Sequence, residues 1–312
     1  MRMNFEEFNN EIVNRIVDYL EEIDVEKIEL INVIKNNDYK MLGLLIKEKN
    51  VSICPTIYLN SYYDDYLRGK DFEEILKDIA FIRNDKHTID NCNINDIGDI
   101  TEFKNIKDKI FPKVINYDMN QKTLHNKVHM RLCDLAIIFY LDIGSTEDGL
   151  LSMIITKDIF KLWNISLEEL KEIAIQNLKI KHPAKCNTIY NVIKHLICGK
   201  NLDISDNNSF DINNAYIEDN EMFVINQGDI NGASIILNDE FMRQILEKFK
   251  NQNIVFIPSS IHEFLIITGD FTKNIDDIKH MISEINCNEV PKQDVLSDNC
   301  YKYTLENGLE LL

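Results

Sequence analysis

The sequence predicts an α+β fold with mixed, mostly antiparallel sheets, packed helices and two lobes. Segments with strand-like alternation and segments with helical apolar spacing follow one another without a regular βαβ order. A stretch at 199–220 is rich in Asn and Asp and poor in large apolar residues, which indicates a linker or insert. We therefore expect a helix and hairpin lobe at 1–130, central strands and helices at 131–198, and a C-terminal α+β lobe at 221–312.

The first lobe begins with clear helix and hairpin signals. Asn4 and Glu7 have the spacing of a capping box, and apolar residues recur at helical intervals up to Leu20. Alternating segments at 27–34 and 41–46 flank turn residues, which predicts a hairpin. The rest of the lobe is expected to hold an extended segment at 56–59, a helix capped by Asn60 and ended by Gly69, a helix capped by Asp71, a surface loop at 84–99, and a helix at 106–117 kinked by Pro112.

The central and C-terminal parts contain the most apolar runs. Residues 135–143 and 150–156 flank a Gly-containing loop and predict two central strands. The remaining expected elements are helices at 157–163, 166–178 and 186–197, strands at 221–226 and 234–237, a helix at 238–250, strands at 254–257 and 264–268, a helix at 275–285, and a last strand at 299–304.

Composition excludes several classes of function. The formal net charge of −18 opposes binding to nucleic-acid phosphate and to anionic lipid. The longest apolar run, Leu135 to Leu141, is too short for a transmembrane helix, which needs about 20 residues. Seven cysteines occur singly with no CxxC pair, as is typical of a reducing cytosol. We expect a cytoplasmic protein with no membrane segment and no direct contact with nucleic acid.

The string Pro258-Ser259-Ser260-Ile261-His262-Glu263 is the strongest candidate for chemistry. A hydroxyl, an imidazole and a carboxylate lie within five residues between two expected strands, and Asp298 is a candidate third catalytic group. Ser260 and His262 can share one face of an extended chain, whereas adjacent residues point to opposite faces. The alternative is a polar turn in which Ser259 and Glu263 contact a partner.

A second candidate surface is rich in tyrosine. Tyr58, Tyr62, Tyr63 and Tyr66 surround two aspartates, and tyrosine is favoured at interfaces because it joins apolar area to a polar tip. Helical spacing of aromatic residues is also typical of a core, so the alternative is burial. We interpret these four tyrosines as a candidate partner-binding surface.

No cofactor or metal is expected. Nucleotide-binding glycine motifs and metalloprotease motifs do not occur in the sequence. His125 and His129 have helical ligand spacing without a third ligand nearby, which favours two surface histidines. The acidic residues of the 199–220 stretch lack EF-hand spacing; they include Asp203, Asp206 and Asp211.

Several strings together resemble a known family. In order along the chain they are Thr56 to Asn60, Leu132 to Leu141, Leu167 to Leu170, Gly232 to Ser234, Ile257 to Glu263, and Val295 to Asp298. The sequence resembles the uncharacterised clostridial family called domain of unknown function 5688, and its C-terminal half is distantly similar to the YtpQ-like family. The YtpQ-like string has no serine matching Ser260, which counts against a hydrolase. The resemblance implies a phage or mobile-element context and transfers no activity.

The sequence favours a non-enzymatic protein-binding or regulatory protein. The motivation is the lack of cofactor motifs together with the tyrosine-rich segment and the polar turn. Two alternatives stay open: a hydrolase-like enzyme using Ser260 and His262, and an acidic inhibitor that mimics nucleic acid.

Overall fold

The computed structural model describes residues 2–21, 23–49, 54, 56–84, 99–146, 149–190, 192–193, 221–250 and 253–312. Within the chain, two compact units form. Unit 1 comprises Met1–Lys35, Tyr39–Ile94 and Gly144–Leu151, and unit 2 comprises Asn36–Asp38, Asn95–Ile143 and Ser152–Leu312. The domain boundaries expected from the sequence stay a prediction, and the expected insert at 199–220 lies outside the described residues.

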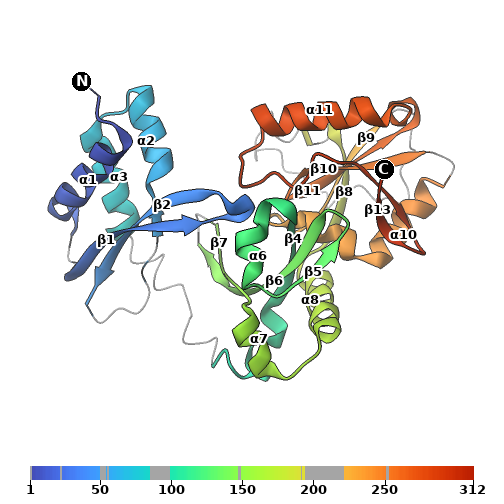
Figure 1. The fold of residues 1–312 in the computed structure, drawn as a ribbon, viewed down its shortest axis with the longest axis horizontal. Helices are drawn as coiled ribbons and strands as arrows, with labels where there is room; N and C mark the ends of the chain where they lie inside the picture. Colours follow the sequence, from blue (N-terminus) through green and yellow to red (C-terminus); the bar gives the residue numbers. More distant parts are fainter. Residues whose placement is uncertain are drawn as a thin grey trace, which may run out of the picture. The chain divides into compact units, whose positions relative to one another are not determined.

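Unit 1 packs three helices against a small antiparallel sheet (Figure 1). Its elements are α1 (Phe5–Arg15), η1 (Ile16–Tyr19), β1 (Val25–Ile34), β2 (Lys40–Glu48), β3 (Thr56–Tyr58), α2 (Leu59–Arg68) and α3 (Phe72–Asn84). The strands pair antiparallel in the order β1-β2-β3. Phe8, Ile12 and Leu76 are fully buried in a core that the helices share with β2 and β3.

The local signals of unit 1 are largely confirmed. Asn4 and Glu7 form the expected capping box, Asp71 accepts the Glu73 backbone N–H at the start of α3, and Gly69 ends α2 with a left-handed φ of 109°. The expected cap at Asn60 is wrong. Helix α2 begins at Leu59, two residues before the start that a cap at Asn60 would give, and the Asn60 side chain instead accepts the backbone N–H of Leu42 in the sheet.

One prediction concerns Glu29 on β1. Its carboxylate pairs with Lys27 and, at 2.6 Å, with Lys47 on β2. Hydrogen bonds from Lys27 and then Lys47 lower the Glu29 pKa from 4.5 to about 2. Because the folded pKa lies below the unfolded one, the stabilisation is present above pH 4.5 and is lost as the pH falls toward 2. Carboxyl-carbon NMR is expected to show a titration midpoint near the lower value, and Lys47→Met should raise it. A midpoint near 4.5 in the unsubstituted chain would contradict the pairing.

A second sheet has strands β4, β6 and β5 in that order, with β7 also paired to β6; it belongs to unit 2 except for Gly144–Leu151, the end of β6 and the start of β7. The elements of this part are η2 (Asn36–Asp38), α5 (Phe103–Ile106), η4 (Lys107–Lys109), β4 (Ile110–Asn116), η5 (Asp118–Asn120), α6 (Gln121–His125), β5 (His129–Leu132), β6 (Leu135–Thr146), β7 (Gly149–Ile154), α7 (Lys157–Trp163) and α8 (Leu167–Lys181). The expected pair of apolar strands is confirmed as β6 and β7. Ser166 caps α8 by accepting the Glu169 backbone N–H.

The helix expected at 106–117 is wrong. After α5 and η4 the chain forms strand β4, with Pro112 opposite Phe139 of β6. Six of the seven β4 residues are buried, so the segment has no polar face from which a strand could be identified by alternation. Proline is tolerated because β4 is the edge strand of its ladder with β6 and β5, where no neighbour needs the missing N–H.

A six-stranded antiparallel sheet completes unit 2, in the order β13-β12-β10-β11-β9-β8. Its elements are β8 (Ala184–Thr188), β9 (Met222–Gln227), η6 (Gly232–Leu237), α10 (Asp239–Lys248), β10 (Ile254–Ser260), β11 (Glu263–Thr268), η7 (Gly269–Thr272), α11 (Ile275–Asn288), β12 (Tyr301–Thr304) and β13 (Gly308–Leu311). Helix α11, at the top of Figure 1, covers one face through Ile278 and Ile282. The other face packs against α10, η6 and the smaller sheet.

Two further expectations in this region are wrong. The segment at 234–237 is a buried 3₁₀ helix, because Asn231 adopts a left-handed φ of 58° and turns the chain. The helix expected at 186–197 is wrong at its start, because residues 186–188 belong to strand β8 at the sheet edge. Residues 189–190 and 192–193 are helical, and the other residues of the expected helix lie outside the described part of the chain. A continuous apolar run does not distinguish a buried strand from a buried helix, which explains the first error.

The α+β class with mostly antiparallel sheets is confirmed. In the described ranges, every helix falls short of the length and apolar character that crossing a membrane requires.

Candidate functional site

The turn between β10 and β11 carries the Pro-Ser-Ser-Ile-His-Glu string, and backbone bonds hold it from two sides. The Ile261 N–H donates to the Asp294 carbonyl at 2.8 Å, and the Ile261 carbonyl accepts the Ala233 N–H at 3.2 Å. Ile261 itself is buried. The turn is therefore fixed between η6 and the loop that precedes β12.

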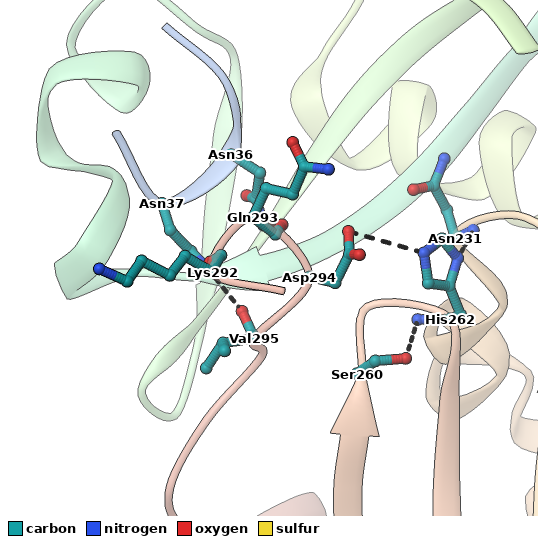
Figure 2. A network of polar contacts seen from close by, with 9 residues as sticks. All are labelled: Asn36, Asn37, Asn231, Ser260, His262, Lys292, Gln293, Asp294 and Val295. Carbon is teal, nitrogen blue, oxygen red and sulfur yellow. Dashed lines mark hydrogen bonds and ion pairs between the residues drawn. The ribbon is translucent and has the colours of Figure 1, made fainter. Parts of the chain in front are cut away.

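Both ring nitrogens of His262 face groups of the same chain (Figure 2). Nδ1 accepts the Asn231 backbone N–H at 3.3 Å, and Nε2 lies 3.7 Å from Oδ1 of Asp294. A ring nitrogen that accepts a hydrogen bond carries no proton, so this partner assigns the proton of the neutral ring to Nε2. The ring is 38% exposed, so its outer edge reaches solvent.

The Ser260 hydroxyl does not act with this imidazole in the structure. Its Oγ accepts the backbone N–H of His262 at 3.0 Å, which is a local turn contact. Asp298, the expected third group, is exposed and accepts the Asn286 side-chain amide at 2.8 Å. The carboxylate beside the imidazole is that of Asp294, which the sequence analysis missed. No local motif marks Asp294, because only the fold brings it to the turn.

Ser259 and Glu263 lie on either side of the turn. The Ser259 hydroxyl donates to Glu263 Oε1 at 3.3 Å, and both side chains are half-buried. They are thus paired with each other across the ladder. Their role in binding a partner stays a prediction.

The loop that presents Asp294 is held mainly by asparagine side chains. Six consecutive carbonyls, from Lys292 to Ser297, accept hydrogen bonds from outside the loop. The donors are Asn37 to Lys292 and Val295 (2.8 and 2.7 Å), Asn36 to Gln293 (2.7 Å), the Ile261 N–H to Asp294 (2.8 Å), Asn116 to Leu296 (3.0 Å) and Asn286 to Ser297 (3.0 Å). Figure 2 shows Asn36 and Asn37 against this loop. Because buried carbonyls need partners, these amides fix a segment that has no strand ladder of its own.

A half-buried carboxylate anchors the next part of the chain. Asp134, in the turn between β5 and β6, accepts hydrogen bonds from the Ser297 hydroxyl (2.6 Å), the Asn299 amide (3.0 Å) and the Tyr301 hydroxyl (2.8 Å). Burial, with the nearby Asp134 charge, raises the pKa of Tyr301. Tyr301 therefore stays protonated and donates its hydrogen to Asp134.

The tyrosine-rich segment contributes to the core of unit 1. Tyr62, Tyr63 and Tyr66 are half-buried and pack against that core. The Tyr63 hydroxyl donates to the Met3 carbonyl, and the Tyr66 hydroxyl accepts the Met3 N–H, each at 3.2 Å. The Tyr58 ring lies 4.0 Å from the Lys35 ammonium. These contacts account for much of the tyrosine surface, and a partner-binding role for it stays a prediction.

The two histidines with helical spacing do not share a helix. His125 is the last residue of α6, whereas His129 begins strand β5. Across the described part of the chain, no three His, Cys, Asp or Glu side chains gather to hold a metal ion. Asp203, Asp206 and Asp211 lie outside the described residues.

The comparison with protein families identifies the chain at the family level. A model described as a family of unknown function matches residues 5–304. The chain belongs to the DUF5688 family. No curated protein and no solved structure matches it.

In this DUF5688 chain, four of the strings that carry the family resemblance contact one another. They are Leu132 to Leu141, Gly232 to Ser234, Ile257 to Glu263, and Val295 to Asp298. Hydrogen bonds join Ala233 to Ile261, and Ser297 to Asp134. The Ile261 N–H also binds the loop that contains Val295 to Asp298. The strings are far apart in the sequence, so their meeting marks the surroundings of the β10–β11 turn as the candidate site.

Proposed function

We propose that this chain is a non-enzymatic protein-binding or regulatory protein of the cytoplasm, and that it engages its partner through the turn Pro258–Glu263. The observation that carries the proposal is the set of partners that the two ring nitrogens of His262 face. Since Nδ1 accepts the Asn231 N–H and Nε2 faces Asp294, neither nitrogen is placed to take a proton from Ser260. The turn thus combines the polar groups of a recognition surface with a histidine held for structure.

The rigidity of the turn supports a binding role. A segment that is already ordered loses little conformational entropy when a partner binds, so its contacts contribute more fully to affinity. Backbone bonds to η6 and to the 292–297 loop order this turn, while Ser259, His262 and Glu263 keep part of their surface in solvent. The phage or mobile-element context implied by the family resemblance belongs to the same proposal.

The hydrolase alternative requires a different geometry. A working serine–histidine pair needs the ring nitrogen about 3 Å from the hydroxyl. The observed Ser260 oxygen instead accepts the His262 backbone N–H. The geometry therefore favours the binding proposal over the enzyme.

The proposal predicts a partner contact that is centred on the turn. A photo-crosslinking amino acid is placed at Ser259 in the full chain, and the matched control carries it at exposed Glu306 in the β12–β13 turn. Crosslinking in cells of the source organism is expected to give one discrete protein adduct from position 259 and none from position 306. The same partner, purified, should bind Glu263→Ala about tenfold more weakly, because that substitution removes a polar group of the contact.

Two results would reject the proposal. One is an adduct of equal yield from both positions, which indicates random contact. The other is hydrolysis of an ester or amide substrate that is abolished by Ser260→Ala and by His262→Gln alike, which would restore the hydrolase alternative.

A further inference from the structure

A basic stretch interrupts this acidic chain. Residues 104–131 contain seven Lys or Arg and only two Asp, against a net charge of −18 for the whole chain. The stretch runs from α5 through β4 and α6 to β5, all within unit 2. Local charge of this sign can attract an anion although the average field is negative, because salt screens charges beyond about 8 Å at physiological ionic strength.

Around α6 and β5, the start of α7 with Lys157 contacts the end of the basic stretch. Lys127 forms an isolated bridge with Thr156, and the Lys157 ammonium donates to the His125 carbonyl at 2.7 Å. The cationic and imidazole side chains from α6 to β5, together with Lys157, are Lys122, His125, Lys127, His129, Arg131 and Lys157. We call these residues, with Tyr117, the α6–β5 surface.

An aromatic residue accompanies the charges. The Arg131 guanidinium lies 4.5 Å from the centre of the Tyr117 ring, and the centre of the His129 ring lies 6.2 Å from the same point. Nε of Arg131 donates to the Cys133 carbonyl at 3.0 Å. These contacts orient the guanidinium while its terminal nitrogens remain available, in the planar arrangement that binds a carboxylate through two hydrogen bonds.

The acids nearest this surface are Asp38, Asp118 and Asp158, and Asp118 is exposed at the start of η5. Asp38 accepts the backbone N–H groups of Lys122 and Thr123 at the start of α6, and Asp158 pairs with Lys161 at 3.5 Å. Among the described residues, the side chains of Lys122, Lys127, Arg131 and Lys157 have no carboxylate partner within ion-pair distance. Other cations of the chain, such as Lys47 and Lys70, are ion-paired.

We propose that the α6–β5 surface binds a short acidic segment of a partner protein. Its size favours this occupant over nucleic acid. A five-residue helix and a four-residue strand extend about 7 and 13 Å, which matches about four residues of extended peptide. A nucleic acid carries its charge past both ends of such a patch, whereas a peptide can have neutral flanks.

This surface lies on different elements from the turn at Pro258–Glu263, and the inference does not rest on the proposed function. The experiment uses the full chain and fluorescence anisotropy. The probe is a labelled peptide with four consecutive glutamates flanked by glycine and serine, and the comparison peptide carries glutamine in their place. We expect the glutamate peptide to bind at low ionic strength, the glutamine peptide not to bind, and the affinity to fall as salt is added.

Charge-neutral substitutions locate the binding. The double substitution Lys122→Gln and Lys127→Gln is expected to weaken binding of the glutamate peptide about tenfold, and adding Arg131→Gln should weaken binding further. The matched control is Lys179→Gln with Lys250→Gln, which changes the net charge equally on α8 and after α10 and should leave affinity within about twofold. Circular dichroism confirms that each variant folds, and the first pair spares the Arg131–Tyr117 contact.

Three outcomes would overturn the proposal. They are failure of the glutamate peptide to bind, equal weakening by the control pair, and tighter binding of a short oligothymidylate with the same dependence on Lys122 and Lys127. The last result would assign the surface to nucleic acid.

Discussion

Gly232→Ala is expected to lower the free energy of unfolding of unit 2 by about 3 kcal/mol. A Cβ atom at this position would lie 2.4 Å from the His262 carbonyl oxygen, 2.9 Å from the Asn226 Cβ and 3.2 Å from the Gln227 nitrogen. Two of these three atoms belong to the backbone, and the Ala233–Ile261 hydrogen bond holds η6 against the turn. The neighbours therefore cannot move apart without breaking the contacts that fix His262.

Urea unfolding followed by tryptophan fluorescence measures this effect. Trp163 is the sole tryptophan of the chain; it is buried in unit 2, and its indole N–H donates to the Ile100 carbonyl. The control is Gly308→Ala, where a Cβ meets no atom within 4 Å but φ is +70°, so only a backbone cost of about 1 kcal/mol is expected. Equal destabilisation by the two substitutions would contradict the close approach of Gly232 to the turn.

Elements defined by local contacts could be predicted from the sequence. The capping residues Asn4, Ser166 and Asn238 lie three positions before the N–H groups that they accept, so spacing alone identifies them. The sequence also predicts strands at 254–257 and 264–268 with a polar turn between them, and the structure has β10 and β11 there. Strand β4 could not be predicted from the sequence, because nearly every position is buried and the apolar residues do not alternate with polar ones. Its proline is compatible with a strand only at a sheet edge, and the sequence does not show that β4 lies at an edge.

The candidate site depends on contacts between distant residues, and only part of it was predictable. The string around His262 was identified from its residue types. Its actual carboxylate neighbour, Asp294, follows 32 positions later, and the loop that presents it is bound by Asn36 and Asn116, which are 257 and 180 positions from their partners. An asparagine in the sequence indicates a turn or cap, and nothing local shows which of them will bind a remote carbonyl.

Asp134→Ala is expected to lower the free energy of unfolding of unit 2 by about 3–5 kcal/mol, the second large effect, because several donors lose a charged acceptor at once. The carboxylate accepts three hydrogen bonds, from Ser297, Asn299 and Tyr301, and alanine would leave all three donors without their acceptor. Ser297 and Tyr301 are buried, so water cannot readily replace the lost partner. Urea unfolding with Trp163 fluorescence is again the measurement.

A second substitution separates the loss of the carboxylate from the loss of one contact. Tyr301→Phe removes a single donor and keeps the ring, so it should cost about 1–2 kcal/mol. If Asp134→Ala costs no more than Tyr301→Phe, the carboxylate does not organise the segment as the geometry indicates. If it costs several times more, the same carboxylate also fixes Ser297, the last residue of the loop that holds Asp294 beside His262. The Asp134 variant should then weaken partner crosslinking from position 259 while folded, because the turn loses a support that lies outside its own surface.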